Sequence, residues 1–469
     1  MTRFLTILLT LYLPAAQLLQ ARAVMDADDE PRHMVPYPEG RCYMMRLTLR
    51  DKQQNQCSVE RPEEFLSPRA IERRQRQHLK VDSTDLPISD CYLRQLREQG
   101  ANVVSCSKWN NTVVVRGKST TQMKALEKLP FVKDAILVWR SPDSIQSRRE
   151  RDTWTGEFRK WDDVEPSVYG VTLQQTRLIG GEGLHDQGYL GEGMQIAVLD
   201  GGFMNVDKIE AFKDVSILGT ADMVVPRSRN IYKEVDHGTK VLSTMAVSVP
   251  AYYRGTAPMA QYWLVRCEDS ETEQLVEEDY WAAAAEWADS VGADIISTSV
   301  GYHDFDYSSM HHKYRDLDGH RTLISNSASM LASKGIVMVC SAGNDGMGSW
   351  KKINPPADAE HVITVGAVTL KGKNAAFSSI GPTADDRVKP DVMAVGSPAA
   401  VITGRGSIRQ DMGTSFAAPQ VAGLVACLWQ KMPEKTALEI MDLVLKSGNN
   451  ASQPDNICGY GVPDFGSIK

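Results

Sequence analysis

The chain has 469 residues, more than one typical domain, so we expect at least two folded units. A net charge of -7 at neutral pH and a pI near 5.8 give no reason to expect a nucleic-acid partner. The hydrophobic fraction of 42% is that of an ordinary globular protein with a sizeable core.

Residues 1–23 have the pattern of a secretory signal. Arg3 supplies a positive start, residues 4–13 are apolar, and Ala21-Arg22-Ala23 is an A-x-A cleavage site. The apolar segment is too short to span a bilayer, and no later segment reaches transmembrane length. We therefore expect secretion to the extracellular space or the periplasm, with no membrane span in the mature form. An uncleaved anchor is the alternative.

Residues 24–140 are expected to form a small α+β unit. Strands are predicted over 42–49, 101–106, 112–115 and 131–139, and helices over 67–77, 88–98 and 120–129. The helix over 67–77 is strongly basic. A β-α-β-β-α-β order with one extra helix is the split βαβ, or ferredoxin-like, layout.

Residues 141–168 read as an exposed linker, because they are polar, charged and without apolar periodicity. Such segments are preferred sites of proteolytic nicking. Arg148, Arg149 and Arg151 are candidate processing sites, although a run of charges is also ordinary solvated surface. We expect cleavage within this linker and assign no bond.

Residues 169–469 alternate between strand and helix patterns. Strands are predicted over 195–199, 261–266, 294–298, 336–340, 361–368 and 392–395, and helices over 237–247, 273–290, 323–333, 416–430 and 434–445. Repeated βα units predict an α/β domain with a mostly parallel sheet and helices on both faces. Its active residues should lie at the carboxyl ends of strands.

Three side chains in this domain are candidate catalytic groups. Asp200 follows a buried-strand pattern, His237 opens a helix, and Ser415 lies at the start of an apolar helix rich in small residues. A serine needs an imidazole as base, and the imidazole needs a carboxylate to orient it. A helix N-terminus also favours the oxyanion that serine attack generates. An isolated Thr-Ser pair would more simply be a helix cap, but the acid and the histidine favour catalysis.

These stretches resemble the three active-site signatures of subtilisin-like serine proteases, the subtilase family, in the order Asp, His, Ser. The motifs are Asp200–Gly202, His237–Thr239 and Gly413–Pro419. The resemblance covers roughly residues 169–465. It implies a secreted, self-processing serine endopeptidase in which Ser415 attacks the peptide carbonyl, His237 moves the proton and Asp200 orients the imidazole. No redox cofactor or catalytic metal is implied.

The resemblance also assigns the oxyanion and substrate-binding residues. Asn344 would donate its side-chain amide to the oxyanion, together with the backbone N–H of Ser415, although alone it would be a turn residue. An extended substrate would pair with the backbone as an added strand. The residues expected at the substrate are Ser299, Val300, Gly301, Ala342, Gly343 and Asn354. No acid or arginine stands out near Asn354, so we expect an uncharged or apolar side chain before the scissile bond.

The small N-terminal unit is, by the same resemblance, a prodomain that assists folding and inhibits the enzyme. An accessory domain that stays attached is the alternative. The expected partners are therefore protein or peptide substrates and the chain's own prodomain. Phe416 stands where the family usually has methionine, which is an oxidation liability, so we expect tolerance of peroxide.

Metals and disulfides are left open. Segment 302–321 is rich in Asp and His, and Asp316-x-Asp318-Gly319 resembles part of a calcium loop without its distal glutamate. Structural calcium is possible, but a solvated loop is the simpler interpretation, and no metal ligand is assigned. Eight cysteines fall four to each unit, which permits two disulfides in each. Cys340 and Cys427 could instead be buried free thiols.

Two alternative functions are compatible with this pattern. The same triad can pass the acyl group to an amine, as in a peptide ligase or macrocyclase. A catalytically inactive peptide-binding or chaperone protein could share the fold, although the complete triad argues against it.

Overall fold

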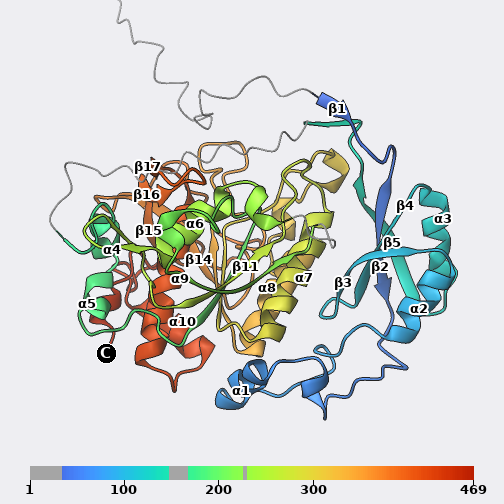
Figure 1. Ribbon diagram of the computed structural model, residues 1–469, viewed down its shortest axis with the longest axis horizontal. Helices are drawn as coiled ribbons and strands as arrows, with labels where there is room; N and C mark the ends of the chain where they lie inside the picture. Colours follow the sequence, from blue (N-terminus) through green and yellow to red (C-terminus); the bar gives the residue numbers. More distant parts are fainter. Residues whose placement is uncertain (1–33, 147–166, 225–229) are drawn as a thin grey trace, which may run out of the picture.

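The computed structural model describes residues 34–146, 167–224 and 230–469, which form a small N-terminal unit packed against a large α/β unit (Figure 1). The expected signal over 1–23 and the three linker arginines lie outside the described residues. Among the helices that are described, none is both long and apolar enough to cross a bilayer.

The N-terminal unit is built on a four-stranded antiparallel sheet in the order β3-β4-β2-β5. Its strands are β2 (Tyr43–Leu49), β3 (Asn102–Ser107), β4 (Thr112–Gly117) and β5 (Val132–Arg140). Its helices are α1 (Pro68–Arg76), α2 (Asp90–Glu98) and α3 (Thr120–Lys124). Alternate residues of a strand point to opposite sides of a sheet, and here the residues on both sides are apolar. Leu47 and Val115 pack with α2, whereas Met44 and Val114 pack against the large unit.

The large unit contains a seven-stranded parallel sheet in the order β15-β14-β13-β12-β7-β11-β8. Its strands are β7 (Gln195–Asp200), β8 (Ser216–Asp222), β11 (Gln261–Arg266), β12 (Ile295–Thr298), β13 (Val337–Ser341), β14 (Ile363–Thr369) and β15 (Val392–Ser397). The α/β class predicted for residues 169–469, with a mostly parallel sheet, is therefore confirmed. Strand β8 was not predicted. It lies at the edge of the sheet, where exposed and half-buried residues alternate and no continuous apolar run forms.

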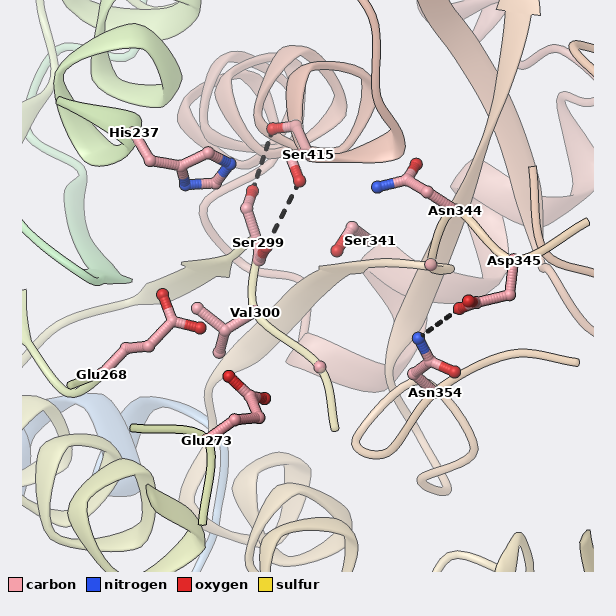
Figure 2. A pocket seen from close by; sticks show the side chains of 12 residues that line it. His237, Glu268, Glu273, Ser299, Val300, Ser341, Asn344, Asp345, Asn354 and Ser415 are labelled. Carbon is pink, nitrogen blue, oxygen red and sulfur yellow. Dashed lines mark hydrogen bonds between the residues drawn. The ribbon is translucent and has the colours of Figure 1, made fainter. Parts of the chain in front are cut away.

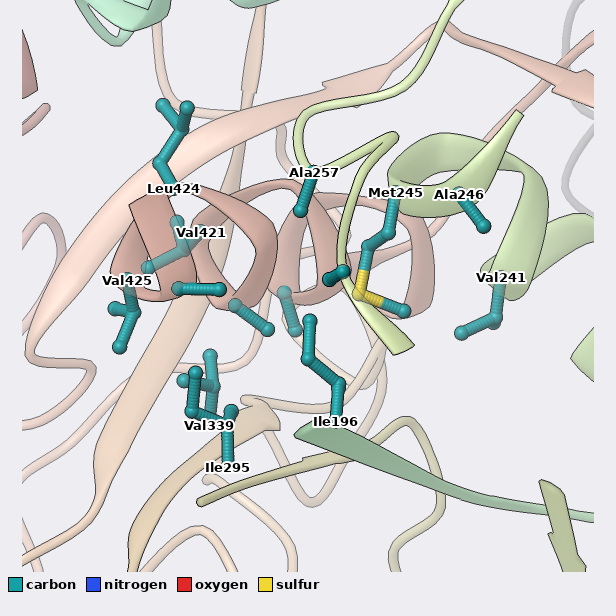
Figure 3. Packing of buried hydrophobic residues seen from close by; sticks show 14 of the residues in the cluster. Ile196, Val241, Met245, Ala246, Ala257, Ile295, Val339, Val421, Leu424 and Val425 are labelled. Atoms are coloured by element: carbon teal, nitrogen blue, oxygen red, sulfur yellow. The ribbon is translucent and has the colours of Figure 1, made fainter. Parts of the chain in front are cut away.

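Helices cover both faces of this sheet. One face carries α6 (His237–Ala246), α9 (Thr414–Lys431) and α10 (Ala437–Lys446), and the other carries α7 (Val276–Val291) and α8 (Leu323–Met330). Figure 3 shows the first face, where Ile196, Ile295 and Val339 of the strands face Val421 and Val425 of α9. These branched side chains are fully buried, as expected for parallel strands covered on both faces.

Short elements complete the fold. Small α4 (Leu173–Leu178) and α5 (Gly181–His185) precede β7, and three two-stranded antiparallel pairs are formed. The pairs are β1 (Met34–Pro36) with β6 (Ser144–Gln146), β9 (Ser248–Val249) with β10 (Tyr253–Arg254), and β16 (Ala399–Ile402) with β17 (Ile408–Asp411).

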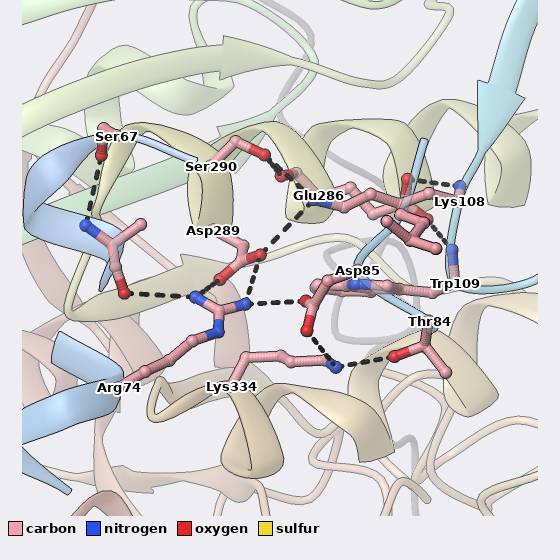
Figure 4. A network of polar contacts seen from close by, with 12 residues as sticks. Ser67, Arg74, Thr84, Asp85, Lys108, Trp109, Glu286, Asp289, Ser290 and Lys334 are labelled. Carbon is pink, nitrogen blue, oxygen red and sulfur yellow. Dashed lines mark hydrogen bonds and ion pairs between the residues drawn. The ribbon is translucent and has the colours of Figure 1, made fainter. Parts of the chain in front are cut away.

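The two units meet through a buried polar network on α7 (Figure 4). Glu286 accepts hydrogen bonds from the backbone N–H groups of Lys108 at 2.7 Å and Trp109 at 3.0 Å. One turn further along the helix, Asp289 pairs with Arg73 and Arg74 of α1. The basic helix predicted over 67–77 therefore lies against the large unit.

Candidate active site

Asp200 and His237 are brought together at the carboxyl edge of the sheet. Asp200 ends β7, and His237 is the first residue of α6. The helix can begin so close to the strand because residue 238 is glycine: an added Cβ at Gly238 would collide with the carbonyl oxygen of Gly202. Nδ1 of His237 lies 2.9 Å and 3.0 Å from the two carboxylate oxygens of Asp200.

The buried carboxylate fixes the tautomer of the imidazole. Asp200 is fully buried and also accepts the N–H of Gly201 at 2.8 Å. Since a carboxylate can only accept, the proton sits on Nδ1 of His237, and Nε2 faces the pocket as a base. Burial lowers the pKa of His237, but the charge and hydrogen bond of Asp200, helped by the charge of Glu268, outweigh it and raise that pKa to about 9.

Ser415 lies beside this pair, in the first turn of α9 (Figure 2). Its Oγ donates to the carbonyl oxygen of Ser299 at 3.3 Å, and the hydroxyl of Ser299 donates back to the carbonyl oxygen of Ser415 at 2.9 Å. Within the described part of the chain, no hydrogen bond joins Ser415 Oγ to His237. A rotation about χ1 of Ser415 would exchange the Ser299 carbonyl for the imidazole, and such loose contacts are common in resting active sites.

Asn344 presents a hydrogen-bond donor to the same space. Its Oδ1 accepts from the backbone N–H of Thr414 at 3.0 Å and from the Thr414 hydroxyl at 3.1 Å. A backbone N–H only donates, so the atom that it contacts must be the amide oxygen, and Nδ2 is directed into the pocket (Figure 2). The N–H of Ser415, in the first helical turn, has no partner within its helix. Two donors therefore border the place where an oxyanion would form.

These groups line one pocket of about 390 Å³. It is lined by His237, Glu268, Glu273, Ser299, Val300, Gly301, Ser341, Gly343, Asn344, Asp345, Asn354 and Ser415. Ala342 is the one expected substrate residue that is not part of the lining. It is fully buried, and its carbonyl oxygen accepts the N–H of Asn354 at 3.2 Å.

Four lining residues were not predicted from the sequence: Glu268, Glu273, Ser341 and Asp345. Asp345 accepts from Nδ2 of Asn354 at 2.8 Å, so the expectation that no acid lies near Asn354 is wrong. Glu268 and Ser341 follow or end strands of the sheet, and their position at its carboxyl edge was the signal that could have found them.

The two glutamates lie in an acidic environment. Burial, and then the charge of Asp200, raise the pKa of Glu268 to about 7. Burial, and then the charge of Glu268, raise the pKa of Glu273 to about 8. An oxygen of Glu268 lies where it would be 2.8 Å from a Cβ added to Gly201, the residue after Asp200.

In segment 302–321, two histidines contact acidic side chains of the same chain. Nε2 of His312 lies 2.7 Å from Glu278, and Nδ1 of His311 lies 2.9 Å from Asp304. Among the described residues, no group of three or more His, Cys, Asp or Glu side chains is placed to hold a metal ion.

All eight cysteines are free, so the disulfides that their number permits are not formed. Cys340 and Cys427 are fully buried, in agreement with the alternative of buried thiols. Burial raises the pKa of Cys340 to about 12, which makes it a poor nucleophile at neutral pH.

Comparisons with known proteins give matches to both units of the chain. A model of the subtilase family matches residues 191–461, and a model of the peptidase S8 propeptide domain of Bacteroidota matches residues 44–153. Subtilisin NAT of Bacillus subtilis subsp. natto is 31% identical over 262 residues, which is 55% of this chain and 61% of that protein. Serine protease AprX of Bacillus subtilis (strain 168) is 31% identical over 303 residues, 58% of this chain and 65% of that protein. The matches thus span less than two thirds of these relatives.

A solved structure shows the same fold. The MycP3 protease from the type VII (ESX-3) secretion system aligns with a TM-score of 0.51 at 19% sequence identity. The alignment covers 66% of this chain and 89% of that chain.

Proposed function

We propose that this chain, which belongs to the subtilase family, is a serine endopeptidase made as a precursor with an inhibitory N-terminal unit. One observation carries the proposal: the Asp200–His237 pair, the hydroxyl of Ser415 and the amide of Asn344 border one pocket at the carboxyl edge of the sheet. Secretion is part of the proposal and rests on the sequence pattern of residues 1–23.

The arrangement supports acyl transfer in two steps. Ser415 Oγ attacks the peptide carbonyl carbon while Nε2 of His237 takes the hydroxyl proton, and Nδ2 of Asn344 and the Ser415 N–H stabilise the oxyanion. His237 then passes the proton to the leaving amine as the C–N bond breaks. A water molecule attacks the acyl-enzyme with His237 as base, which releases the carboxylic acid and restores Ser415. Throughout, Asp200 holds the imidazole and stabilises its charged form.

The substrate is expected to bind as an extended strand on residues 299–301, with the side chain before the scissile bond directed toward Asn354. The N-terminal unit ends beside this path. Gln274 accepts the N–H of Arg140 and donates to its carbonyl oxygen, both at 2.9 Å, so the end of β5 is fixed next to Glu273. This contact supports inhibition by the N-terminal unit and cleavage in the linker that follows.

Expression of the wild type beside Ser415→Ala tests the proposal. The wild type should cut itself within residues 141–168, as read by N-terminal sequencing of the products, and should react with a fluorophosphonate probe. The variant should stay intact and unlabelled. A wild type that is folded but neither processed nor labelled would show that the site does not perform this chemistry.

A further inference from the structure

Two glutamates of the active-site pocket have carboxylates without a protein partner. Glu268 lies two residues beyond β11, and Glu273 lies shortly before α7; both line the pocket with His237 and Ser415. Across the described ranges, neither carboxylate takes part in a hydrogen bond or an ion pair. Only burial and the charges of neighbouring groups act on them.

Arg266, a cation that acts on Glu268, is already engaged. Arg266, which is 1% exposed, donates to the carbonyl oxygen of Gly201 at 3.1 Å and pairs with Asp222 at 3.3 Å and Glu234 at 3.7 Å. The imidazole of His237 is held by the catalytic aspartate. The surroundings of the two glutamates therefore have an excess of negative charge.

Acids dominate the field at Glu273 in particular. The charged groups that act on it most strongly are Glu268, Asp306, Asp269 and Asp304, and each raises its pKa. The side chains of Glu268 and Glu273 are half-buried, and a cation placed between neighbouring carboxylates is attracted to them. The pocket thus has the charge of a binding site for a cationic side chain.

The direction of the substrate assigns the two glutamates to particular positions. Successive side chains of an extended peptide point to opposite sides. Figure 2 shows Val300 between Asn354 on one side and Glu268 with Glu273 on the other. If the residue before the scissile bond faces Asn354, the second and fourth residues before the bond face the glutamates.

The order of the two glutamates along the cleft follows from their neighbours. Glu268 is close to the catalytic pair, because one of its oxygens lies 2.8 Å from the place of a Cβ added to Gly201, the residue after Asp200. Glu273 precedes Gln274, which holds the backbone of Arg140 where the chain leaves the N-terminal unit. Residues farther upstream of the scissile bond therefore lie at Glu273.

We propose that the enzyme selects substrates with lysine or arginine at the second and fourth positions before the scissile bond, with Glu268 binding the former and Glu273 the latter. This inference rests on the proposed function, because it names the substrate class of the same site. A bound ammonium or guanidinium group supplies the missing counter-ion and a charge-assisted hydrogen bond to each carboxylate. The chain's own linker has matching chemistry, since it carries Arg148, Arg149 and Arg151.

A fluorogenic peptide library that varies the four residues before the scissile bond tests the proposal on the self-processed protein. Wild type should prefer lysine or arginine over norleucine by about tenfold to a hundredfold in kcat/KM at both positions, the range of a charge-assisted hydrogen bond. Glu268→Gln should lose the preference at the second position and Glu273→Gln that at the fourth. Glu192→Gln, an exposed change at the opposite edge of the sheet, should keep both.

The readout separates failure of this inference from failure of the proposed function. The preference is a ratio of two substrates on one enzyme sample, so partial misfolding of a variant does not alter it, and fluorophosphonate titration counts the active sites. A labelled, active enzyme with no preference for lysine or arginine, or with preferences that survive both glutamine substitutions, would overturn only the specificity. A folded protein that neither hydrolyses peptides nor reacts with the probe would overturn both.

Discussion

Replacement of Asp289 by asparagine should release the N-terminal unit from the catalytic unit. The Asp289 carboxylate binds Arg73 and, at 2.9 Å, Arg74, and Lys108 lies 3.6 Å away. Asp289 and the two arginines are at most 1% exposed. Burial raises the pKa of Asp289, but the charges of Arg73, Arg74 and Lys108 outweigh it and lower that pKa to about 2.

The size of the effect follows from this burial. Removing one partner of a buried ion pair costs about 3–5 kcal/mol, because a charge is left buried without its partner. Within the described residues this charge is Arg73, whereas Arg74 keeps Asp85 at 2.9 Å. At about 1.4 kcal/mol per tenfold change, the dissociation constant of the two units should rise by roughly two to four orders of magnitude. All three cations belong to the N-terminal unit, so the loss falls on association and not on the folding of the catalytic unit.

The same pair predicts a dependence on pH. Because the pKa of Asp289 is lowered in the complex, its contribution is complete above the ordinary aspartate value of about 3.9 and is lost as the pH falls toward about 2. Between these values, association should weaken in the wild type, and Asp289→Asn should lack this component. Gel filtration of the self-processed protein reads this change, because His237 is protonated and inactive at such pH.

Recovery of peptidase activity on dilution of the self-processed protein measures the dissociation constant. Asp442→Asn is the matched control, since this carboxylate pairs with Lys446 on the surface of α10 and both side chains are more than half exposed. The control should behave as the wild type, because such exposed pairs contribute at most about 1 kcal/mol. A dissociation constant for Asp289→Asn within about threefold of the wild type would refute the reasoning, because a loss of even about 3 kcal/mol raises the constant by roughly two orders of magnitude.

Three further predictions concern catalysis. Asn344→Ala should lower kcat by about two to three orders of magnitude with little change in KM, because the amide donor of Asn344 acts on charge that develops in the transition state. Steady-state kinetics in which mainly KM changes would contradict this. Activity should rise with pH toward about 9, because only neutral His237 accepts the Ser415 proton. Glu268→Gln should move this limb of the kcat/KM profile to lower pH, and an unchanged limb would show that the charge of Glu268 does not raise the pKa of His237. Hydrogen peroxide should inactivate the wild type more slowly than Phe416→Met, measured as residual activity over time, and equal rates would reject the idea.

Much of the fold could be predicted because parallel strands buried on both faces give continuous apolar runs. The runs before Asp200 and over 336–340 became β7 and β13, and the helices that begin at His237 and Thr414 place their first residues at the same edge. Strand β8 could not be found this way, because an edge strand with exposed residues lacks that run.

The burial of the basic helix α1 could not be predicted from its own composition. The sequence predicts only that the helix is strongly basic, and only the fold shows that Asp289, more than 200 positions away, pairs with Arg73 and Arg74. The burial of a charged side chain depends on where its partner lies. That position is set by the packing of the two units and not by local sequence.

The same dependence on distant partners explains why Glu268 and Glu273 were not predicted as part of the pocket. Asp289 is fully buried and pairs with cations, and its pKa falls to about 2. Within the described residues, the carboxylates of Glu268 and Glu273 make no ion pair, and their pKa values rise to about 7 and about 8. Both glutamates are half-buried in the pocket, so their carboxylates are open to a ligand that enters it. At α7 the chain itself supplies the counter-ion, and in the pocket beside His237 the counter-ion arrives with the substrate.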